Sequence, residues 1–455
     1  MSLWGAAVEH VLFPAWEGRL RGRPTLERLA FLERTQWRSL DELLAIQAGE
    51  LRRLLRHAFE HVPLYRARFE AAGVRPEEIR GPEDLPRLPV LTREEAMDSA
   101  RERRSTAPPL PTIRKTTSGS TGQPLAFAYD PGSEYWRQAV KLRGYGWAGH
   151  RVGRRTLYYW GAPVVPPPPL AARAKIAVDH FLKRERYVDC TQRSPAGLDR
   201  LVRTIRRDRP DVMVCFSMSG AALARHVLAT GARTWKDIPV IAAAERLWPA
   251  DREALEAAFG RCVFETYGSR EVMLIAAECE AHDGLHCSME NLVVELLVEE
   301  DGRARPARPG EAGDVVITDL HNFGMPFIRY RNGDRAIAGP ASRCACGRSL
   351  VRLGGVEGRV TDALRLPDGT RVSGLVFNVI FAVLGAHVRQ FQAVQHRDGA
   401  ITLRLVRAAS FTDGTRAAIL DNCARHLPGV PLRIEQVDDI PLSPSGKRRV
   451  VVVEK

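Results

Sequence analysis

The hydrophobic pattern of the first hundred residues predicts helices. In the stretch "LDELLAIQAGELRRLLRHAFEHVPLYRARF", which runs from residue 40 to residue 69, apolar residues recur at intervals of three and four. That spacing places them on one face of a helix. Pro63 interrupts the pattern, so we expect two helices that meet there. Farther along, Thr92 and Glu95 have the spacing of a capping box and predict the start of another helix.

The middle of the chain predicts strands that alternate with helices. The apolar runs "TLYYWG", "DVMVCFS" and "IPVIAAAE" are typical of buried strands, and helical segments separate them. Such alternation indicates an α/β sheet. Three closely spaced runs follow, "LVVELLVEE", "AGDVVITDL" and "MPFIRYRNGDRAIAG", and they predict a β-rich subdomain. After Gly358 the pattern changes to strand, turn, helix and strand.

These patterns predict an α/β protein with two domains. A chain of 455 residues is too long for one ordinary hydrophobic core. We expect a large N-terminal domain over residues 1–357, built of layered α/β sheets and the β-rich subdomain, and a small α+β C-terminal domain over residues 358–455.

The composition is that of a globular protein, with 45% hydrophobic and 27% charged residues. No apolar segment is long enough for a membrane span, and the N-terminus lacks the pattern of a secretory signal, so we expect a cytoplasmic protein. The formal net charge is +13, but the arginines are dispersed and no nucleic-acid-binding motif accompanies them. We therefore expect no nucleic-acid partner, and nothing in the sequence indicates an oligomeric state.

One stretch, "TTSGSTGQPLAF" at residues 116–127, is rich in glycine and hydroxyl groups. Glycine lets the backbone come close to a ligand, and backbone N–H groups and hydroxyls donate hydrogen bonds to phosphate oxygens. The stretch is not a Walker A loop, because no Gly-Lys-Ser/Thr ends it. Taken alone, its composition is also typical of a flexible surface linker.

Four distant motifs favour the phosphate loop. They are "FETYGSREV" with Tyr267, "RYRNGDR" with Asp334, "EGRVTDAL" with Arg359 and "PLSPSGKRR" with Lys447. Together with the loop, their order and spacing resemble the adenylate-forming ligases, which couple ATP to a carboxylic acid through an acyl-adenylate. Within that superfamily the chain resembles the phenylacetate-CoA ligase-like proteins, especially their branch named for capsular polysaccharide biosynthesis. "HAFEHVPLYRARF", "EDLPRLPVLTREE" and "ECEAHDGLH" add to a resemblance that spans from about residue 51 to the C-terminus.

The resemblance implies a role for each motif in binding nucleotide. Glu271 would hold Mg²⁺ on the phosphates, since a hard oxygen ligand suits this cation. Gln123 stands where relatives usually have lysine, so the loop would act through its backbone donors. Tyr267 would stack near the adenine, with ordinary core packing as the alternative, and Asp334 would accept hydrogen bonds from the ribose hydroxyls. The residues expected to contact ATP are Ser118, Gly119, Ser120, Thr121 and Gly122 of the phosphate loop, Tyr267, Gly268 and Ser269 of the second motif, Asp334, and Arg359, which would lie close to the same nucleotide.

Catalysis is expected to involve Lys447, Glu271 and Arg270. In the family the small C-terminal domain is mobile and rotates at a hinge, which Asp362 matches here. It brings the late lysine, matched by Lys447, over the carboxylate and α-phosphate for the first half-reaction, where its charge would offset that of departing pyrophosphate. Arg270 replaces a threonine common in the superfamily. We hypothesise that its guanidinium contacts the α-phosphate or the substrate carboxylate, the alternative being a surface salt bridge.

The resemblance implies coenzyme A as the acceptor of an aryl or alkyl acyl group. Phenylacetate-CoA ligases generally follow the hinge with an "RGVNVFP"-like segment, whereas this chain reads "LRLPDGTRVSGLVFNVIF". An amine or hydroxyl acceptor, giving an amide or ester, is therefore an alternative. A non-catalytic nucleotide-binding scaffold is another, although the presence of Glu271, Asp334 and Lys447 counts against it.

A second set of residues is independent of ATP. "ECEAHDGLH" and "SRCACGRSL" supply thiols and imidazoles on two loops, which would complete a closed tetrahedral Zn²⁺ site of structural type. Reduced buried thiols are the alternative, and Cys287 is a further candidate ligand. Some phenylacetate-CoA ligase relatives have such a zinc, and the resemblance in "GLH" favours His286 over His282. The expected ligands are Cys279, His286, Cys344 and Cys346.

Overall fold

The computed structural model describes most of the chain. It covers residues 3–109, 111–117, 125–161, 169–190, 194–300, 302–358, 364–367, 371–372, 376–377, 380–381, 387–440 and 451–454. The expected phosphate-loop residues 118–122, together with Arg359, Asp362 and Lys447, lie outside the described residues.

Helices dominate the first hundred residues, as their hydrophobic spacing predicts. The break at Pro63 is confirmed, since one helix ends at His61 and the next begins at Pro63. The capping box at Thr92 is also confirmed, because its hydroxyl accepts a hydrogen bond from the backbone N–H of Glu95. The α-helices are α1 (Leu3–Ala7), α2 (Thr25–Thr35), α3 (Leu40–His61), α4 (Pro63–Ala72) and α5 (Arg93–Asp98). Short π-helices, η1 (Val8–Leu12) and η2 (Ala15–Leu20), and short 3₁₀-helices, η3 (Pro76–Glu78) and η4 (Pro82–Arg87), accompany them.

One large sheet forms the centre of the N-terminal part. It has 12 strands in the order β11-β10-β12-β13-β14-β9-β8-β7-β6-β5-β3-β4 among the described residues. The strands are β3 (Thr156–Tyr159), β4 (Glu185–Val188), β5 (Val212–Phe216), β6 (Val240–Ala243), β7 (Val263–Ser269), β8 (Met273–Glu278), β9 (Leu285–Cys287), β10 (Leu292–Glu300), β11 (Arg303–Pro306), β12 (Ala312–Asp319), β13 (Tyr330–Ala338) and β14 (Arg352–Gly358).

Strand β7 is where the sheet changes direction. It pairs in parallel with β6, and it pairs antiparallel with β8, where Tyr267 lies opposite Ala276. The strands from β4 to β7 are parallel, and those from β7 to β11 are antiparallel. The predicted α/β sheet and the predicted β-rich subdomain are therefore parts of one mixed sheet.

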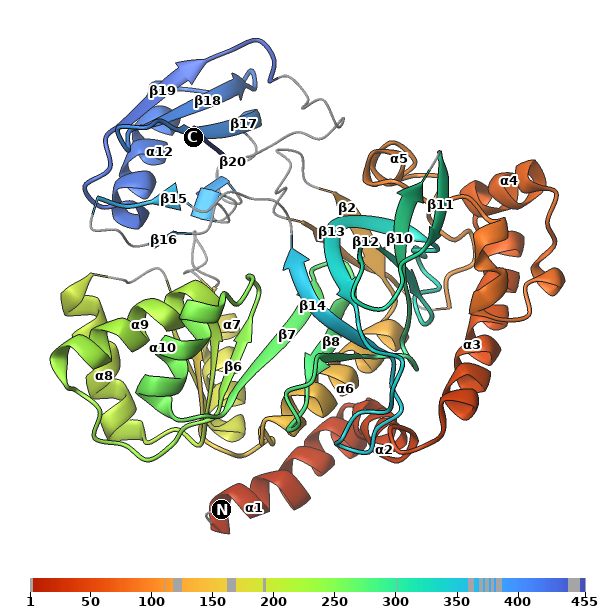
Figure 1. The fold of residues 1–455 in the computed structure, drawn as a ribbon, viewed down its shortest axis with the longest axis horizontal. Helices are drawn as coiled ribbons and strands as arrows, with labels where there is room; N and C mark the ends of the chain where they lie inside the picture. Colours follow the sequence, from red (N-terminus) through yellow and green to blue (C-terminus); the bar gives the residue numbers. More distant parts are fainter. Residues whose placement is uncertain are drawn as a thin grey trace.

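Helices cover the parallel strands. Helices α8 (Pro195–Asp208), α9 (Ser217–Thr230) and α10 (Pro249–Phe259) lie together beside β6 (Figure 1), and they share a buried apolar cluster with the parallel strands. Helix α6 (Pro131–Trp147) packs against α2 and β8, and α7 (Leu170–Lys183) lies next to β4. Among the described residues, no helix combines the length and apolarity needed to cross a membrane.

The C-terminal residues form separate sheets. Strands β17 (Val388–Gln395), β18 (Ile401–Arg407), β19 (Leu432–Gln436) and β20 (Val451–Val453) have the order β19-β18-β17-β20, and α12 (Asp413–His426) connects β18 to β19 (Figure 1). Among the C-terminal residues, β15 (Leu364–Arg365) also pairs with β16 (Arg371–Val372). In the N-terminal part, β1 (Ile113–Thr116) and β2 (Ala126–Tyr129) form a further two-stranded sheet. One buried apolar cluster consists only of residues from 364 onward. The predicted boundary near residue 358 stays a prediction.

Candidate functional site

A buried arginine joins two of the expected site segments. Arg93, the first residue of α5, donates from Nη1 to Oε1 of Glu271 at 3.1 Å and from Nη2 to Oγ1 of Thr117 at 2.9 Å. The Tyr330 hydroxyl donates to the same Glu271 oxygen at 3.2 Å. The Arg93 and Glu271 side chains are only 7% and 3% exposed. Thr117 directly precedes the expected phosphate loop, and Arg93 links it to the carboxylate expected to hold Mg²⁺.

The two residues described on either side of the expected phosphate loop are hydrogen-bonded to each other. The backbone N–H of Thr117 donates to the carbonyl oxygen of Leu125, and the backbone N–H of Leu125 donates to the Thr117 hydroxyl, both at 2.9 Å. The register of β1 and β2 continues from this pair, with Thr116 opposite Ala126. Residues 118–124 therefore connect two strands whose ends meet next to Arg93.

The expected adenine and ribose residues also meet. The Tyr267 hydroxyl donates to Oδ2 of Asp334 at 2.8 Å, and Nδ2 of Asn332 donates to both of these groups, at 2.9 and 3.0 Å. All three side chains are buried. Gly268 follows Tyr267 where a Cβ atom would lie 2.2 Å from the backbone oxygen of Met273, so only glycine fits.

A bulge in β13 presents Asp334, the carboxylate expected near the ribose. The pairing of β12 with β13 shifts between Asp314 and Val316, opposite the sequence Asn332-Gly333-Asp334. Gly333 has a φ of 89°, a left-handed conformation that glycine adopts without strain. Asn332 Oδ1 accepts from the backbone N–H of Asp334 at 3.0 Å. Bulges of this kind redirect side chains beside functional sites, and this one directs Asn332 and Asp334 toward Tyr267.

Arg270 and Ser269 lie at the end of β7. Arg270 is exposed, and its positive charge opposes the effect of burial on Tyr129, whose pKa is nevertheless raised to about 12. Arg270 therefore lies near Tyr129, and Tyr129 belongs to β2, the strand that follows the expected phosphate loop. The Ser269 hydroxyl is buried and has no hydrogen-bond partner among the described residues. An unsatisfied buried hydroxyl at this position is available to a ligand.

Arg137, another buried arginine, holds the backbone of Glu271. Arg137 on α6 donates from Nη1 to the backbone oxygen of Glu271 at 2.5 Å and from Nη2 to Oδ2 of Asp319 at 2.7 Å. Sequence reasoning missed Arg93, Arg137 and Asn332. Two of these had a signal: Arg93 is a cation in the first turn of a helix, where the helix dipole disfavours it, and Asn332-Gly333 is a turn dipeptide inside a strand.

The four expected metal ligands form one cluster. One ligand atom from each of Cys279, His286, Cys344 and Cys346 lies within 4.8 Å of the other three. They come from two segments about 60 residues apart in the sequence, which the pairing of β9 with β14 holds side by side. Burial lowers the pKa of His286 to about 4, so its ring is neutral at pH 7, as a metal ligand requires.

Two distances within this cluster match the edges of a tetrahedral site. With Zn–S bonds of about 2.3 Å and Zn–N bonds of about 2.0–2.1 Å, a tetrahedron has S···S edges of about 3.8 Å and S···N edges of about 3.5 Å. The Sγ atoms of Cys279 and Cys344 are 3.8 Å apart, and Sγ of Cys346 is 3.4 Å from Nε2 of His286. Nδ1 of His286 is 3.3 Å from the Leu350 carbonyl oxygen, an orientation that leaves Nε2 toward the sulfurs.

The alternative ligands are engaged elsewhere or lie outside the cluster. Nδ1 of His282 is 3.0 Å from Oε1 of Glu278. Cys287 is buried, and burial raises its pKa to about 12, but it is not part of the metal-competent group found among the described residues. The structure therefore brings His286, rather than His282 or Cys287, together with the thiols of Cys279, Cys344 and Cys346.

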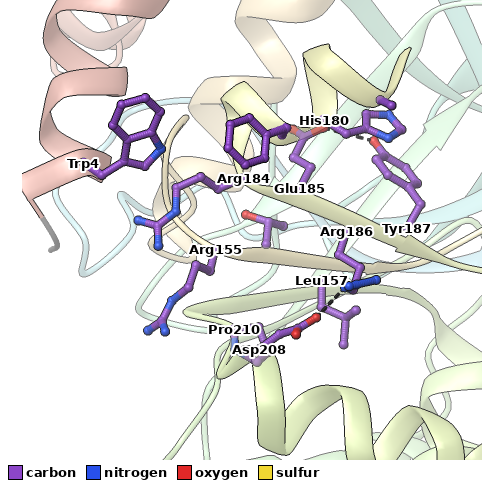
Figure 2. A pocket seen from close by; sticks show the side chains of 13 residues that line it. Trp4, Arg155, Leu157, His180, Arg184, Glu185, Arg186, Tyr187, Asp208 and Pro210 are labelled. Atoms are coloured by element: carbon purple, nitrogen blue, oxygen red, sulfur yellow. Dashed lines mark hydrogen bonds and ion pairs between the residues drawn. The ribbon is translucent and has the colours of Figure 1, made fainter. Parts of the chain in front are cut away.

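A surface hollow of about 930 Å³ lies at the β4 edge of the large sheet. Figure 2 shows it between α1, α7 and the edge strand β4, with Trp4 and Arg155 at its border. None of the expected site residues lines it. Two of its arginines face carboxylates: Arg155 is 3.0 Å from Asp211, and Arg186 pairs with Asp208. We assign this hollow no part in nucleotide binding.

Comparison with known proteins gives matches to both parts of the chain. Residues 364–454 match the family model of the CapK C-terminal domain. The chain is 29% identical over 353 residues to the phenylacetate-coenzyme A ligase of Escherichia coli, with 72% of this chain and 73% of that protein covered. It is 26% identical over 368 residues to the phenylacetate-coenzyme A ligase of Thermus thermophilus, with 79% and 80% covered.

Solved structures show the same fold. A crystal structure of 2-hydroxyisobutyryl-CoA ligase with 2-HIB-AMP and CoA superposes with a TM-score of 0.59 at 21% identity, covering 91% of each chain. A second crystal structure of that enzyme, in the postadenylation state with R3-HIB-AMP, gives a TM-score of 0.58 at 20% identity, covering 92% of this chain and 90% of the other. The predicted fold class is confirmed.

Proposed function

Because the chain is a relative of the phenylacetate-coenzyme A ligases in the adenylate-forming superfamily, we propose that it is an ATP-dependent ligase that activates a carboxylic acid. One oxygen of the acid bonds to the α-phosphorus of ATP, the bond from that phosphorus to the bridging oxygen breaks, and pyrophosphate leaves. A thiol, that of coenzyme A, then bonds to the acyl carbon, and AMP leaves with the carboxyl oxygen.

The observation that carries this proposal is the convergence of motifs distant in the sequence. Thr117, at the start of the phosphate loop, is linked through Arg93 to Glu271, which is 178 residues from Arg93 along the chain. Tyr267 and Asp334, separated by 67 residues, share a hydrogen bond. In a nucleotide site, contacts to phosphate, magnesium, adenine and ribose would each use one of these segments. A protein that binds no nucleotide has no need to bring them together.

Unsatisfied polar atoms support a ligand at this site. The Ser269 hydroxyl and Nε of Arg93 are buried without hydrogen-bond partners among the described residues. A nucleotide bound here would place adenine beside Tyr267 and ribose hydroxyls at Asp334, with residues 118–122 and Arg359 at the phosphates and ribose. Exposed Arg270 would contact the α-phosphate or the substrate carboxylate with its two parallel N–H groups.

Glu271 fits the role of magnesium ligand. A carboxylate is the hard oxygen donor that Mg²⁺ prefers. The hydrogen bonds that Arg93 and Tyr330 donate to it both end on Oε1, so Oε2 is the oxygen left for the cation. Bound Mg²⁺ would neutralise phosphate charge, and Lys447 would offset the charge of departing pyrophosphate during adenylation.

The cysteine and histidine cluster is proposed as a structural zinc site. Three thiols and one imidazole form a closed tetrahedral set that leaves no position for substrate. The site lies where the Arg348 guanidinium packs 4.6 Å from the centre of the Trp37 ring and bonds Gln36 at 3.0 Å. Zinc would thereby stabilise the loop that follows β13 and its contact with the end of α2.

The test of the proposed function is acid-dependent pyrophosphate release. The full chain is supplied with ATP, Mg²⁺ and a panel of aryl and alkyl carboxylic acids, and hydroxylamine traps any activated acyl group. We expect release with one class of acid and loss of release in Lys447→Ala. Bound ATP with no release across the panel would contradict the ligase and favour a nucleotide-binding scaffold.

The acceptor is tested separately, once an acid is known. Coenzyme A is expected to raise turnover and to yield a thioester. If the enzyme stalls at the adenylate with coenzyme A but turns over with amines or alcohols, the product is an amide or ester instead. In that case the adenylation half of the proposal stands and the thiol acceptor does not.

A further inference from the structure

Arg93 carries its positive charge at a buried position at the start of a helix, where a cation is electrostatically unfavourable. It is the first residue of α5, where unpaired backbone N–H groups and the helix dipole disfavour a cation. Its side chain is 7% exposed, and an arginine that deep needs a counter-charge. The preceding Thr92 already caps the helix, so α5 does not need Arg93 in order to begin.

The contacts of Arg93 divide between two functional segments. Nη1 is shared by Oε1 of Glu271 at 3.1 Å and the hydroxyl of Tyr330 at 3.2 Å. Nη2 donates to Oγ1 of Thr117 at 2.9 Å, which in turn accepts from the backbone N–H of Leu125. Nε is buried with no partner among the described residues. One rigid, planar group therefore touches Thr117, which directly precedes the phosphate loop, and the expected magnesium carboxylate of Glu271 together.

We propose that Arg93 is a positioning residue that couples phosphate binding to magnesium binding, an inference that rests on the proposed function. Its planar fork fixes the distance between Thr117 and Glu271. It also keeps the buried Glu271 compensated before nucleotide arrives. Because the same guanidinium holds both segments, order imposed on one is transmitted to the other.

A second buried arginine provides a matched control. Arg103 is fully buried, and its Nη2 donates to the backbone oxygens of Ala96 and Ala126. Its guanidinium lies 4.4 Å from the centre of the Phe327 ring. No hydrogen bond from Arg103 to Thr117 or Glu271 is present among the described residues. Arg103→Met therefore removes a buried cation from the same region and leaves the Thr117–Arg93–Glu271 link intact.

The experiment measures the binding of a fluorescent ATP analogue, N-methylanthraniloyl-ATP, to the full chain with and without Mg²⁺. In the wild-type protein Mg²⁺ is expected to tighten binding, and the ratio of the two affinities reports the coupling. We expect Arg93→Met to reduce this ratio about 10-fold, within the usual range of coupling between two sites, and Arg103→Met to leave it unchanged. Circular dichroism melting accompanies each variant, so that loss of folding is recognised.

The conservative variant separates charge from bridging. Arg93→Lys keeps a cation near Glu271, but an ammonium group on a flexible stem lacks the planar fork that reaches both partners at once. We expect it to keep a folded protein and to lose most of the coupling. In steady-state pyrophosphate exchange, both Arg93 variants should raise KM for MgATP and leave KM for the acid unchanged.

The possible results separate this inference from the proposed function. If wild-type protein binds the analogue with magnesium-dependent affinity and Arg93→Lys keeps the full ratio, the coupling role is wrong and the ligase stands. An equal loss of coupling in Arg103→Met would also overturn the inference, because the removal of any buried cation from this region would then have the same effect. If the wild-type protein binds no analogue, the proposed function fails, and the role of Arg93 fails with it.

Discussion

Removing one thiol from the cysteine and histidine cluster should destabilise the protein through loss of a metal. Cys344 lies 3.8 Å from Cys279, at the S···S edge of a zinc tetrahedron. Cys344→Ala leaves three ligands, and a structural zinc site with three ligands binds far more weakly. Cys287→Ala is the matched control, because it removes an equally buried thiol that lies next to His286 on β9 but outside the cluster.

The expected magnitude follows from mass action. A metal present at 100 times its dissociation constant stabilises the folded state by about 2.7 kcal/mol. A change of 1 kcal/mol moves Tm by about 2–4 °C in domains of about 150–250 residues, and less in larger ones. We therefore expect Cys344→Ala to lower Tm by at least about 3 °C more than Cys287→Ala. The loss should concentrate in the segment between β13 and β14, which has no strand of its own and contains Cys346.

Three measurements check this prediction. Elemental analysis of the purified protein should find about one zinc per chain in the wild type and in Cys287→Ala, and much less in Cys344→Ala. Calorimetry should give the difference in Tm, and a chelator should lower the wild-type Tm toward that of Cys344→Ala. Hydrogen exchange should show faster opening of residues 339–351. A wild-type protein without metal, or equal Tm values for the two variants, would refute the reasoning and favour reduced thiols.

Three further predictions concern the nucleotide site and pH. Asp334→Asn should raise KM for ATP about 10- to 100-fold, in line with a hydrogen bond to a charged group, and leave KM for the acid unchanged; an unchanged ATP value would exclude a ribose contact. Lys447→Ala should slow adenylation about 100-fold or more but retain thioester formation from supplied acyl-adenylate, so equal loss in both steps would contradict its role. Burial and then the charge of Glu278 raise the pKa of Glu265 to about 7, above the ordinary value near 4.5, so the folded state holds this proton and stability should fall as pH rises through that interval. Thermal melts of Glu265→Gln should show a flatter pH profile over that range; an unchanged slope would assign the dependence to other groups.

Much of the fold follows from periodicity, because the elements are amphipathic or buried in ways that leave a pattern. The break between α3 and α4 is a proline, and β10 and β12 coincide with apolar runs. The start of β13 was predicted too early, at Met325. Arg329 has a φ of 50°, a left-handed turn that apolar spacing does not reveal, and the strand begins after it at Tyr330.

The residues of the candidate site could be predicted from the sequence only where they belong to a short contiguous motif. "YGSRE" and "RNGDR" each predict one side of the proposed nucleotide site, and the structure shows the Tyr267 hydroxyl hydrogen-bonded to Asp334. Arg93 lies in "EDLPRLPVLTREE", a motif that names no partner for it, and its partners Thr117 and Glu271 are 24 and 178 residues away. Contacts of that separation depend on how helix α5 lies against the sheet, which hydrophobic spacing does not determine.

The buried pair of Arg93 and Glu271 limits how this chain can change during evolution. If Glu271 alone were replaced by a neutral residue, a guanidinium with 7% exposure would be left without its counter-charge, at a cost of about 3–5 kcal/mol. Loss of Arg93 alone would strand the carboxylate in the same way. The two positions are therefore expected to covary among related sequences, so that a descendant that abandons nucleotide chemistry would lose both charges together or retain both.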